Sequence, residues 1–366
     1  MEWTDYPRVA LALLLVLTNV GLFAAMSTSG VAYGPYNSEW DGGASVRQEV
    51  STAGATPELV RTTGAYVEAE TDSVGFVVSP TRSYEPRDVA RIRQFVTRGG
   101  TLVVAGEAVN ESAERSATND LLAGLDVRTR LNGTTVRDAQ NNYRNGSLPR
   151  ATNVSDHPLV DGVDRLTLNY GTVLDVPDEQ AVGREARPAV LVSTAQSSYL
   201  DDNDDGELND TEPLGSFPVA VAEPVGDGRV VVVSDASVFT NAMLEQDGNA
   251  AFARALSANA TTAMLDYSHR PPLAPLTYSL LVVRSTPIVQ VALAALSLAL
   301  VALWARWPAT TASTVVRRRL ERGQHSTERT LDEDDVVAFV RDRHPEWDTE
   351  RVRRVSQHII RRREDQ

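Results

Sequence analysis

The chain has 366 residues, a formal net charge of −14 and no cysteine. The absence of cysteine excludes disulfides, a cysteine nucleophile and cysteine-ligated metal sites, and the acid excess argues against nucleic-acid binding. Its basic side chains are all arginine, because the sequence contains no lysine. An acidic, lysine-free surface is typical of proteins that stay soluble in high salt, so we expect a halophilic protein. Codon bias toward arginine is the alternative, although it would not add acids.

The first predicted element is an apolar stretch at 9–26, which follows Arg8 and two acidic residues. A helix needs about 20 apolar residues to cross a bilayer. We expect a transmembrane helix over 9–28, with residues 1–8 in the cytoplasm because Arg8 lies on that side. A cleaved signal peptide is the alternative, but residues 23–26 make a poor cleavage site.

Residues 29–284 are predicted to form one extracellular α/β domain. Its clearest unit is an apolar strand at 74–78, a helix that begins at Pro86 and ends at Gly99, and a strand at 101–105. Such a unit places its two strands in parallel. The predicted fold is a Rossmann-like three-layer α/β sandwich. Its other expected elements are helices at 44–52, 119–124 and 236–256, and strands at 58–62, 66–69, 125–130, 166–174, 189–193, 217–222 and 229–233.

A loop at 201–212 matches the calcium-loop pattern D-x-[DN]-x-[DN]-G-x5-E at every fixed place. Gly206 permits the sharp turn, and the apolar Leu208 is expected to pin the loop to the core. No helix pair flanks the loop, so we expect a lone, weak, structural calcium site; a solvated acidic loop is the alternative. The predicted ligands are Asp201, Asn203, Asp205, Glu207 through its carbonyl, Asn209 and Glu212.

Six N-x-S/T sequons lie between the first apolar stretch and a second one at 285–305, and none lies outside them. Some triplets arise by chance, but this one-sided placement predicts partial glycosylation. The sequon at Asn209 overlaps the calcium loop, where a glycan and a metal ion would exclude each other. The glycosylation candidates are Asn110, Asn132, Asn145, Asn153 and Asn259.

The second apolar stretch carries no charge, and Trp304 and Trp307 lie at its end, as in an interfacial aromatic belt. Arginines follow, so we expect a transmembrane helix at 285–305 with a cytoplasmic tail. Residues 306–329 are predicted to be a basic juxtamembrane linker that meets anionic lipid heads. Residues 330–366 are predicted to form a helical hairpin whose small core favours docking on a partner over independent folding.

Several motifs resemble those of a known family. Residues 74–106 resemble the sheet of class I glutamine amidotransferases, and 228–252 resemble the end of that domain. With the motif at 36–42 and the flanking apolar stretches, they make residues 35–260 similar to the domain-of-unknown-function 4350 family. The resemblance implies an amidotransferase-like fold and a setting beside MoxR-type AAA ATPases and von Willebrand-type proteins.

We do not expect this chain to have amidotransferase activity. That chemistry needs a cysteine at a strand-to-helix elbow, with histidine and glutamate to activate it, whereas this elbow contains Gly106 and Glu107. Asp235 ends a buried strand at the carboxyl edge, where α/β proteins bind ligands, and is either a helix cap or a base. We therefore expect no catalytic and no cofactor-binding residues besides the calcium ligands, and we name Asp235 and Asn241 as possible ligand contacts.

The leading hypothesis is a non-catalytic, two-pass membrane protein whose extracellular domain is a binding or scaffold module in a membrane-associated complex. Its expected partners are the lipid bilayer and a membrane or cytoplasmic protein, such as an AAA ATPase; nucleic acid is not expected. Two alternatives remain open. One is an auxiliary subunit of an ABC-type transporter, and the other is a hydrolase of the same fold that uses Asp235 or Glu107.

Overall fold

The computed structural model describes residues 31–107, 113–177, 187–270, 287–306 and 333–364. Contacts divide the chain into two compact units. The first is Leu13–Gln290, and the second combines Met1–Ala12 with Val291–Gln366. Each unit is described by itself.

An eight-stranded sheet forms the centre of the first unit, in the order β1-β14-β2-β3-β13-β12-β10-β7. The first five strands in this order are parallel, and the last three pair antiparallel. The strands are β1 (Thr56–Val60), β2 (Ser73–Val78), β3 (Thr101–Ala105), β7 (Asn153–Val154), β10 (Ala189–Ser193), β12 (Pro218–Val225), β13 (Gly228–Val233) and β14 (Thr262–Asp266).

Both faces of this sheet are buried, because successive strand residues enter two different cores. Phe76 and Val103 belong to one core and Val77 and Val104 to the other, as the alternation of side chains along a strand requires. Two helices pack on the first face: α2 (Ala44–Thr52) and α6 (Asp247–Ser257). Three pack on the second: α3 (Ala65–Glu68), α4 (Pro86–Thr97) and α5 (Ala113–Gly124).

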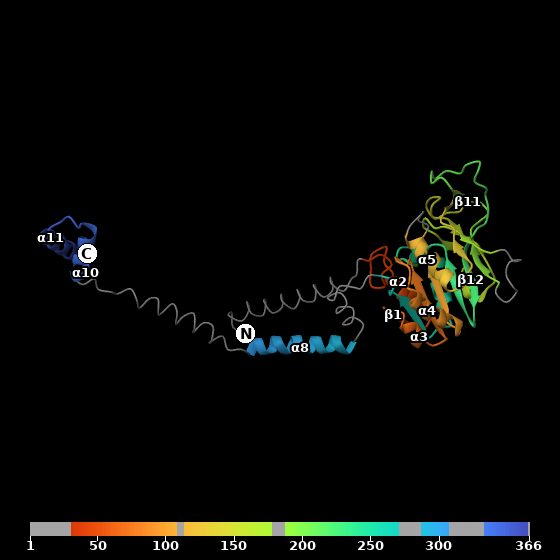
Figure 1. The fold of residues 1–366 in the computed structure, drawn as a ribbon, viewed down its shortest axis with the longest axis horizontal. Coiled ribbons are helices and arrows are strands. Elements are labelled where there is room, and N and C mark those ends of the chain that lie inside the picture. Colours follow the sequence, from red (N-terminus) through yellow and green to blue (C-terminus); the bar gives the residue numbers. More distant parts are fainter. Residues whose placement is uncertain (1–30, 108–112, 178–186, 271–286, 307–332, 365–366) are drawn as a thin grey trace. The chain divides into compact units, whose positions relative to one another are not determined.

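Three small antiparallel sheets extend the domain. β5 (Thr135–Asp138) pairs with β11 (Ser198–Asp201), β4 (Arg130–Leu131) with β9 (Leu174–Asp175), and β6 (Arg150–Ala151) with β8 (Leu166–Thr167). Figure 1 shows β11 at the end of the domain opposite α3. The 3₁₀ helices are η1 (Pro158–Val160), η4 (Ala236–Phe239) and η5 (Met243–Glu245).

The second unit contains two helices within the segment predicted as a hairpin, α10 (Glu333–Arg343) and α11 (Thr349–Glu364). Val340 and Val352 are its buried apolar side chains among the described residues. Asp348 begins α11, since its carboxylate accepts the N–H of Arg351 at 2.7 Å, as an N-cap does.

The two predicted transmembrane helices require correction. No helix among the described residues is both long enough and apolar enough to cross a membrane. The stretch predicted at 285–305 overlaps α8 (Pro287–Arg306). The stretch at 9–28 lies outside the described residues. The absence of a spanning helix among the described residues contradicts the predicted two-pass location, with 29–284 outside and both termini in the cytoplasm.

Candidate functional site

The parallel strands bring several polar residues to one edge of the sheet. Ser79 follows β2, Gly106 and Glu107 follow β3, Asp235 lies just beyond β13, and Asp266 ends β14. β3 and β13 are neighbours, yet α5, which follows β3, and α6, which follows β13, pack on opposite faces. The point between β3 and β13 is therefore a topological switch point, where open α/β sheets bind ligands.

Asp235, predicted as a possible ligand contact, is fully buried at this point. Its Oδ2 accepts the N–H of Asn169 at 2.6 Å, and its Oδ1 accepts the N–H and hydroxyl of Ser237 at 2.8 and 2.5 Å. Burial raises the pKa of Asp235 to about 6, although the hydrogen bonds from Ser237 and Asn169 oppose the shift. The carboxylate caps η4 and anchors the segment 169–172, so it is committed to internal contacts.

The segment 169–172 covers the switch point. The N–H of Thr172 points to the carbonyl of Ser234 at 3.4 Å. A Cβ on Gly171 would lie 2.9 Å from the Cβ of Asp235, closer than such atoms approach. Ala236 continues the pairing of β3 and β13 beyond their ends, because its N–H donates to the carbonyl of Gly106 at 2.7 Å. The chain itself therefore fills the space that a ligand would occupy.

Glu107 lies at the elbow that would carry the nucleophile in an amidotransferase-like site. The hydroxyl of Tyr33 donates a hydrogen bond to its Oε1. The residue preceding it, Gly106, has no room for a side chain, since a Cβ there would lie 2.3 Å from Leu131. The elbow is thus covered by an N-terminal residue of the described domain.

Asn241, the other predicted ligand contact, holds the same N-terminal segment. Its Nδ2 donates to the carbonyls of Asn37 and Glu39 at 2.9 and 2.5 Å. Its Oδ1 accepts the N–H of Ser45 at 2.8 Å. The predicted contacts Asp235 and Asn241 therefore lie near the expected edge, but both act within the fold.

A second group of ionisable side chains, which the sequence did not single out, surrounds Asp266. The hydroxyls of Tyr66 and Tyr84 donate to its Oδ2 at 2.8 and 3.2 Å, and the N–H of Ser268 donates to Oδ1 at 2.6 Å. The Tyr84 hydroxyl also lies 3.2 Å from Nδ1 of His269. The buried Nε2 of His269 has no hydrogen-bond partner in the described part of the chain.

Burial dominates the protonation of this group. It raises the pKa of Asp266 and of both tyrosines. Burial also lowers the pKa of His269 to about 3, and the charges of Arg270 and Arg82 act in the same direction. The histidine is therefore neutral at pH 7, and the group is a buried hydrogen-bonded network. The only signal in the sequence was an acidic residue directly after the apolar run 263–265.

The predicted calcium loop leaves β11 and closes through its own ligand side chains. Asp201 is buried, and its two carboxylate oxygens accept the N–H groups of Asp205 and Gly206 at 3.1 and 3.0 Å. Gly206 has a φ of 80°, as the sharp turn requires. Both carboxylate oxygens of Glu212 also accept backbone N–H groups, from Asp202 and Asn209, each at 3.0 Å.

The remaining predicted ligands stabilise the centre of the loop. Asp205 accepts the N–H of Glu207 at 2.8 Å and the amides of Asn203 and Asn209 at 2.8 and 3.1 Å. These hydrogen bonds, with that of Glu207 first, lower the pKa of Asp205. The loop thus brings all six predicted ligands into one hydrogen-bonded turn. Leu208 is 48% exposed, so the expectation that it pins the loop to the core is wrong.

A basic side chain enters this loop from β5. Arg137 forms an ion pair through Nε with Asp201, and its Nη1 donates to the hydroxyl of Ser147 at 2.5 Å. Its guanidinium also lies 3.5 Å from the Cβ position of Gly206. Within the described residues, no group of three or more His, Asp or Glu side chains is placed to hold a metal ion.

The glycosylation candidates differ in exposure. Asn145, Asn153 and Asn259 are exposed, whereas the amide of Asn132 donates to Asp175 at 3.1 Å. Asn110 lies outside the described residues. Glycosylation stays a prediction at each of these positions.

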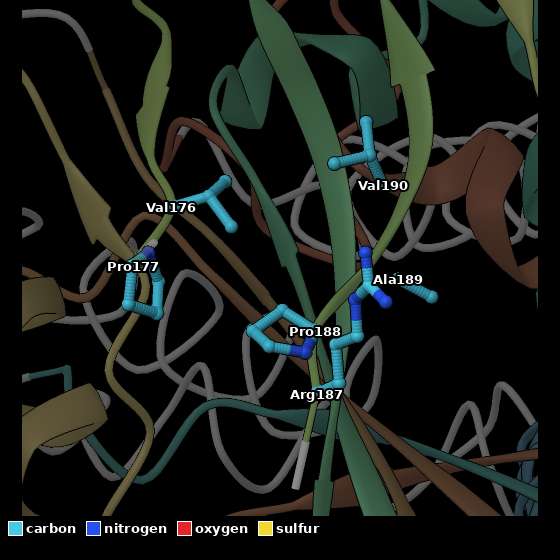
Figure 2. Close-up of a pocket in the computed structure, with 6 residues that line it drawn as sticks. All are labelled: Val176, Pro177, Arg187, Pro188, Ala189 and Val190. Atoms are coloured by element: carbon cyan, nitrogen blue, oxygen red, sulfur yellow. The ribbon is translucent and has the colours of Figure 1, made fainter. Parts of the chain in front are cut away.

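A separate open pocket of about 460 Å³ lies beside the end of β9 and the start of β10 (Figure 2). None of the predicted site residues lines it. The segment 178–186, which joins its two sides in sequence, lies outside the described residues. Its lining residues are Val176, Pro177, Arg187, Pro188, Ala189 and Val190.

The protein contains a mixed α/β domain. Other segments of the same chain cover the switch point at the carboxyl edge of its sheet. Residues 35–256, more than half of the chain, match the family described as a domain of unknown function, DUF4350. The chain therefore belongs to this family, as predicted. The amidotransferase-like description and the halophilic origin stay predictions.

Two solved structures illustrate how distant the similarities are. The mmIFT52 N-terminal domain is 15% identical over 52% of this chain and 76% of that chain, with a TM-score of 0.38. A cytoplasmic protein from Salmonella typhimurium LT2 is 14% identical over 58% of this chain and 79% of that chain, with a TM-score of 0.34. Such values carry no argument about function. No curated protein matches the chain.

Proposed function

We propose that the α/β domain is a non-catalytic binding or scaffold module of a multi-protein complex. The observation that carries this proposal is the closure of the switch point. Asp235 lies beneath the segment 169–172, and Tyr33 holds Glu107. Covalent acyl transfer needs an activated nucleophile open to the substrate, and these contacts occupy the positions where one would act.

An exposed tryptophan supports the binding part of the proposal. Trp40 is 71% exposed, although its loop is fixed by hydrogen bonds. The carbonyls of Trp40 and Gly42 accept the N–H groups of Ala242 and Asn241 at 3.0 and 2.7 Å. Tryptophan is enriched among the residues that dominate binding energy at protein interfaces, and a rigid loop presents it at little entropic cost.

Co-purification tests the scaffold proposal directly. The full-length chain and a chain without residues 330–366 are tagged, purified in high salt, and compared for bound proteins. An AAA ATPase lost on truncation would support a scaffold with a tail-docked partner. A transporter nucleotide-binding subunit would instead favour the transporter alternative. Hydrolase activity in the isolated chain that disappears in Asp235→Asn or Glu107→Gln would contradict the non-catalytic assignment.

Replacing Trp40 with alanine should weaken binding of a captured partner by about 2 kcal/mol or more, roughly 30-fold in Kd. The melting temperature should not change, because the side chain is exposed. Titration of the purified partner measures the effect. The matched control is Tyr170→Ala, which removes another exposed aromatic ring, 56% accessible, from a different segment. Equal affinities for the Trp40 variant and the parent would remove this residue from the interface.

We also propose that the loop 201–212 binds calcium as a structural ion. Its donors are oxygens from carboxylates, amides and a carbonyl, which is the ligand chemistry that calcium prefers. The residues that would hold it are Asp201, Asn203, Asp205, Glu207, Asn209 and Glu212. Arg137 already contributes a positive charge beside Asp201, so the metal ion would compete with this guanidinium, which favours weak binding.

Calcium at about 10 mM should stabilise the parent by about 1.4–2.7 kcal/mol, if its Kd falls in the weak range of 10⁻⁴–10⁻³ M. Asp205→Ala should abolish this gain because it removes a central carboxylate. Thermal unfolding with calcium and with magnesium measures the effect. Asp202→Ala is the control, since its exposed side chain is not a predicted ligand. A calcium gain that persists in Asp205→Ala would contradict the site.

A further inference from the structure

Two of the predicted glycosylation sequons contain the same chemically reactive dipeptide. Asn132 and Asn145 are the two asparagines of the chain that are followed directly by glycine. Glycine has no side chain to shield its backbone nitrogen, so this nitrogen can attack the side-chain amide of the preceding asparagine. The two dipeptides share this chemistry, and any difference in their reactivity therefore comes from the fold around them.

Both asparagines hold their side-chain oxygen in the same way. Oδ1 of Asn145 accepts the N–H of Ser147 at 2.9 Å. Oδ1 of Asn132 likewise accepts the N–H of Thr134 at 3.1 Å. Attack on the amide carbon places negative charge on this oxygen, and a hydrogen-bond donor that already contacts the oxygen stabilises that charge. The local turn therefore favours the same reaction at both positions.

The surrounding fold opposes the reaction at Asn132. The N–H of the buried Gly133 donates to Oγ1 of Thr172 at 2.8 Å, and Thr172 is itself fully buried. Nδ2 of Asn132, which would have to leave, donates to the carboxylate of Asp175 at 3.1 Å. Attack would break both hydrogen bonds and leave buried polar groups without partners, which costs free energy.

Asn145 has neither of these restraints. Its side chain is exposed, and Gly146 is half-buried. Within the residues that the structure describes, neither the N–H of Gly146 nor Nδ2 of Asn145 donates a hydrogen bond. The attacking nitrogen and the leaving amide are thus both available, while the oxygen between them keeps its hydrogen-bond donor.

We propose that Asn145 is a site of spontaneous deamidation and that the fold protects Asn132 from the same reaction. Hydroxide removes the proton from the Gly146 nitrogen, which bonds to Cγ of Asn145. Nδ2 takes a proton from water and leaves as ammonia, which regenerates the hydroxide. The product is a cyclic imide, and water opens it to aspartate or isoaspartate. The inference goes beyond the proposed function and does not depend on it, because the reaction requires no partner.

The modification changes a turn that contacts the loop 201–212 through one side chain. The hydroxyl of Ser147 accepts Nη1 of Arg137 at 2.5 Å, and Arg137 forms an ion pair with Asp201. Deamidation adds a negative charge to this turn, and isoaspartate also lengthens its backbone by one methylene group. It removes the amide nitrogen to which a glycan would attach, so deamidation and glycosylation of Asn145 exclude each other.

Peptide mass spectrometry of the full chain, after incubation in mildly alkaline buffer, tests the proposal. Asn145 should lose its amide at least about tenfold faster than Asn132, the factor that corresponds to about one hydrogen bond. In denaturant the two rates should converge, because the dipeptides are identical. Equal rates in the folded chain would overturn the proposal. A difference that persists in denaturant would also overturn it, because the fold would then not be the cause.

Two substitutions test the two sites separately. Gly146→Ala should slow the loss at Asn145 severalfold, because the methyl group shields the attacking nitrogen. The fold tolerates this change, since the added Cβ would lie 3.6 Å from its nearest neighbour, the carbonyl oxygen of Asp138. Thr172→Val should accelerate the loss at Asn132 by about tenfold, because it removes the acceptor of the Gly133 N–H.

The conservative variant Thr172→Ser keeps the hydroxyl and should keep Asn132 protected. The rate at Asn145 should be the same in the parent and in both Thr172 variants. An unchanged rate at Asn132 in Thr172→Val would overturn the protection that we assign to this hydrogen bond. An unchanged rate at Asn145 in Gly146→Ala would overturn the attack by the Gly146 nitrogen.

Discussion

Replacing Phe252 with alanine is expected to lower the free energy of unfolding by about 3–5 kcal/mol. Phe252 of α6 is fully buried. Its ring stacks on Phe239 of η4 with centroids 6.2 Å apart, and Phe239 meets the edge of Phe76 of β2 at 5.8 Å. The three rings join a helix, the segment beyond the switch point and the sheet, so the alanine variant would leave a cavity between all three.

Denaturant unfolding of the full chain measures this loss, which is a large share of the 5–15 kcal/mol typical of folded domains. The control is Phe339→Ala in α10, where the ring is 62% exposed. Its cost should stay within about 0.5 kcal/mol. Similar losses for the two variants would mean that the stacked rings do not hold the helix to the sheet.

Local patterns in the sequence predicted several elements with their exact bounds. The helix at 44–52 and the strands at 101–105 and 189–193 are α2, β3 and β10. Each is bounded by local signals and buries a regular set of apolar residues. β14 (Thr262–Asp266) was missed, although it lies between β1 and β2 in the sheet. Its place depends on pairing between segments about 200 residues apart, which no local pattern reveals.

Tertiary contacts overrode two other predictions. The strand predicted at 66–69 is the helix α3, where the buried Tyr66 packs on Phe95 at 5.4 Å and bonds to Asp266. The helix predicted at 236–256 is broken, and α6 begins only at Asp247. The N–H groups of Asn241 and Ala242 donate to the carbonyls of Gly42 and Trp40 instead of to a helix, so a distant loop interrupts an otherwise helical pattern.

The sequence predicted where the candidate site lies, but it did not predict that other segments of the chain close the site. The apolar run before Ser234 and Asp235 indicated a strand that ends at the carboxyl edge, and that is where Asp235 lies. What closes the edge comes from elsewhere in the chain: Tyr33 from the N-terminal side and Asn169 from between β8 and β9. Neither segment carries a local signal for this contact.

His269 is expected to make the protein lose stability in acid. Its pKa is lowered to about 3 in the folded state by burial and by the charges of Arg270 and Arg82, whereas the unfolded value is about 6.5. Below pH 6.5 the unfolded chain therefore binds a proton that the folded chain refuses. The contribution is fully present above pH 6.5 and falls by about 1.4 kcal/mol per pH unit as the pH drops toward 3.

The comparison with His269→Gln isolates this effect, because glutamine is polar and does not titrate. Between pH 6.5 and 4.5 the parent should lose about 2.3 kcal/mol relative to the variant, measured by denaturant unfolding at each pH. The variant Asp235→Asn tests a second pH effect on stability, which has the opposite sign to that of His269. The raised pKa of Asp235, about 6, means that the folded parent gains stability as the pH falls from 6 toward 3.8, so it should gain relative to that variant. Parallel pH profiles for the parent and His269→Gln would mean that the histidine is not buried as a neutral side chain.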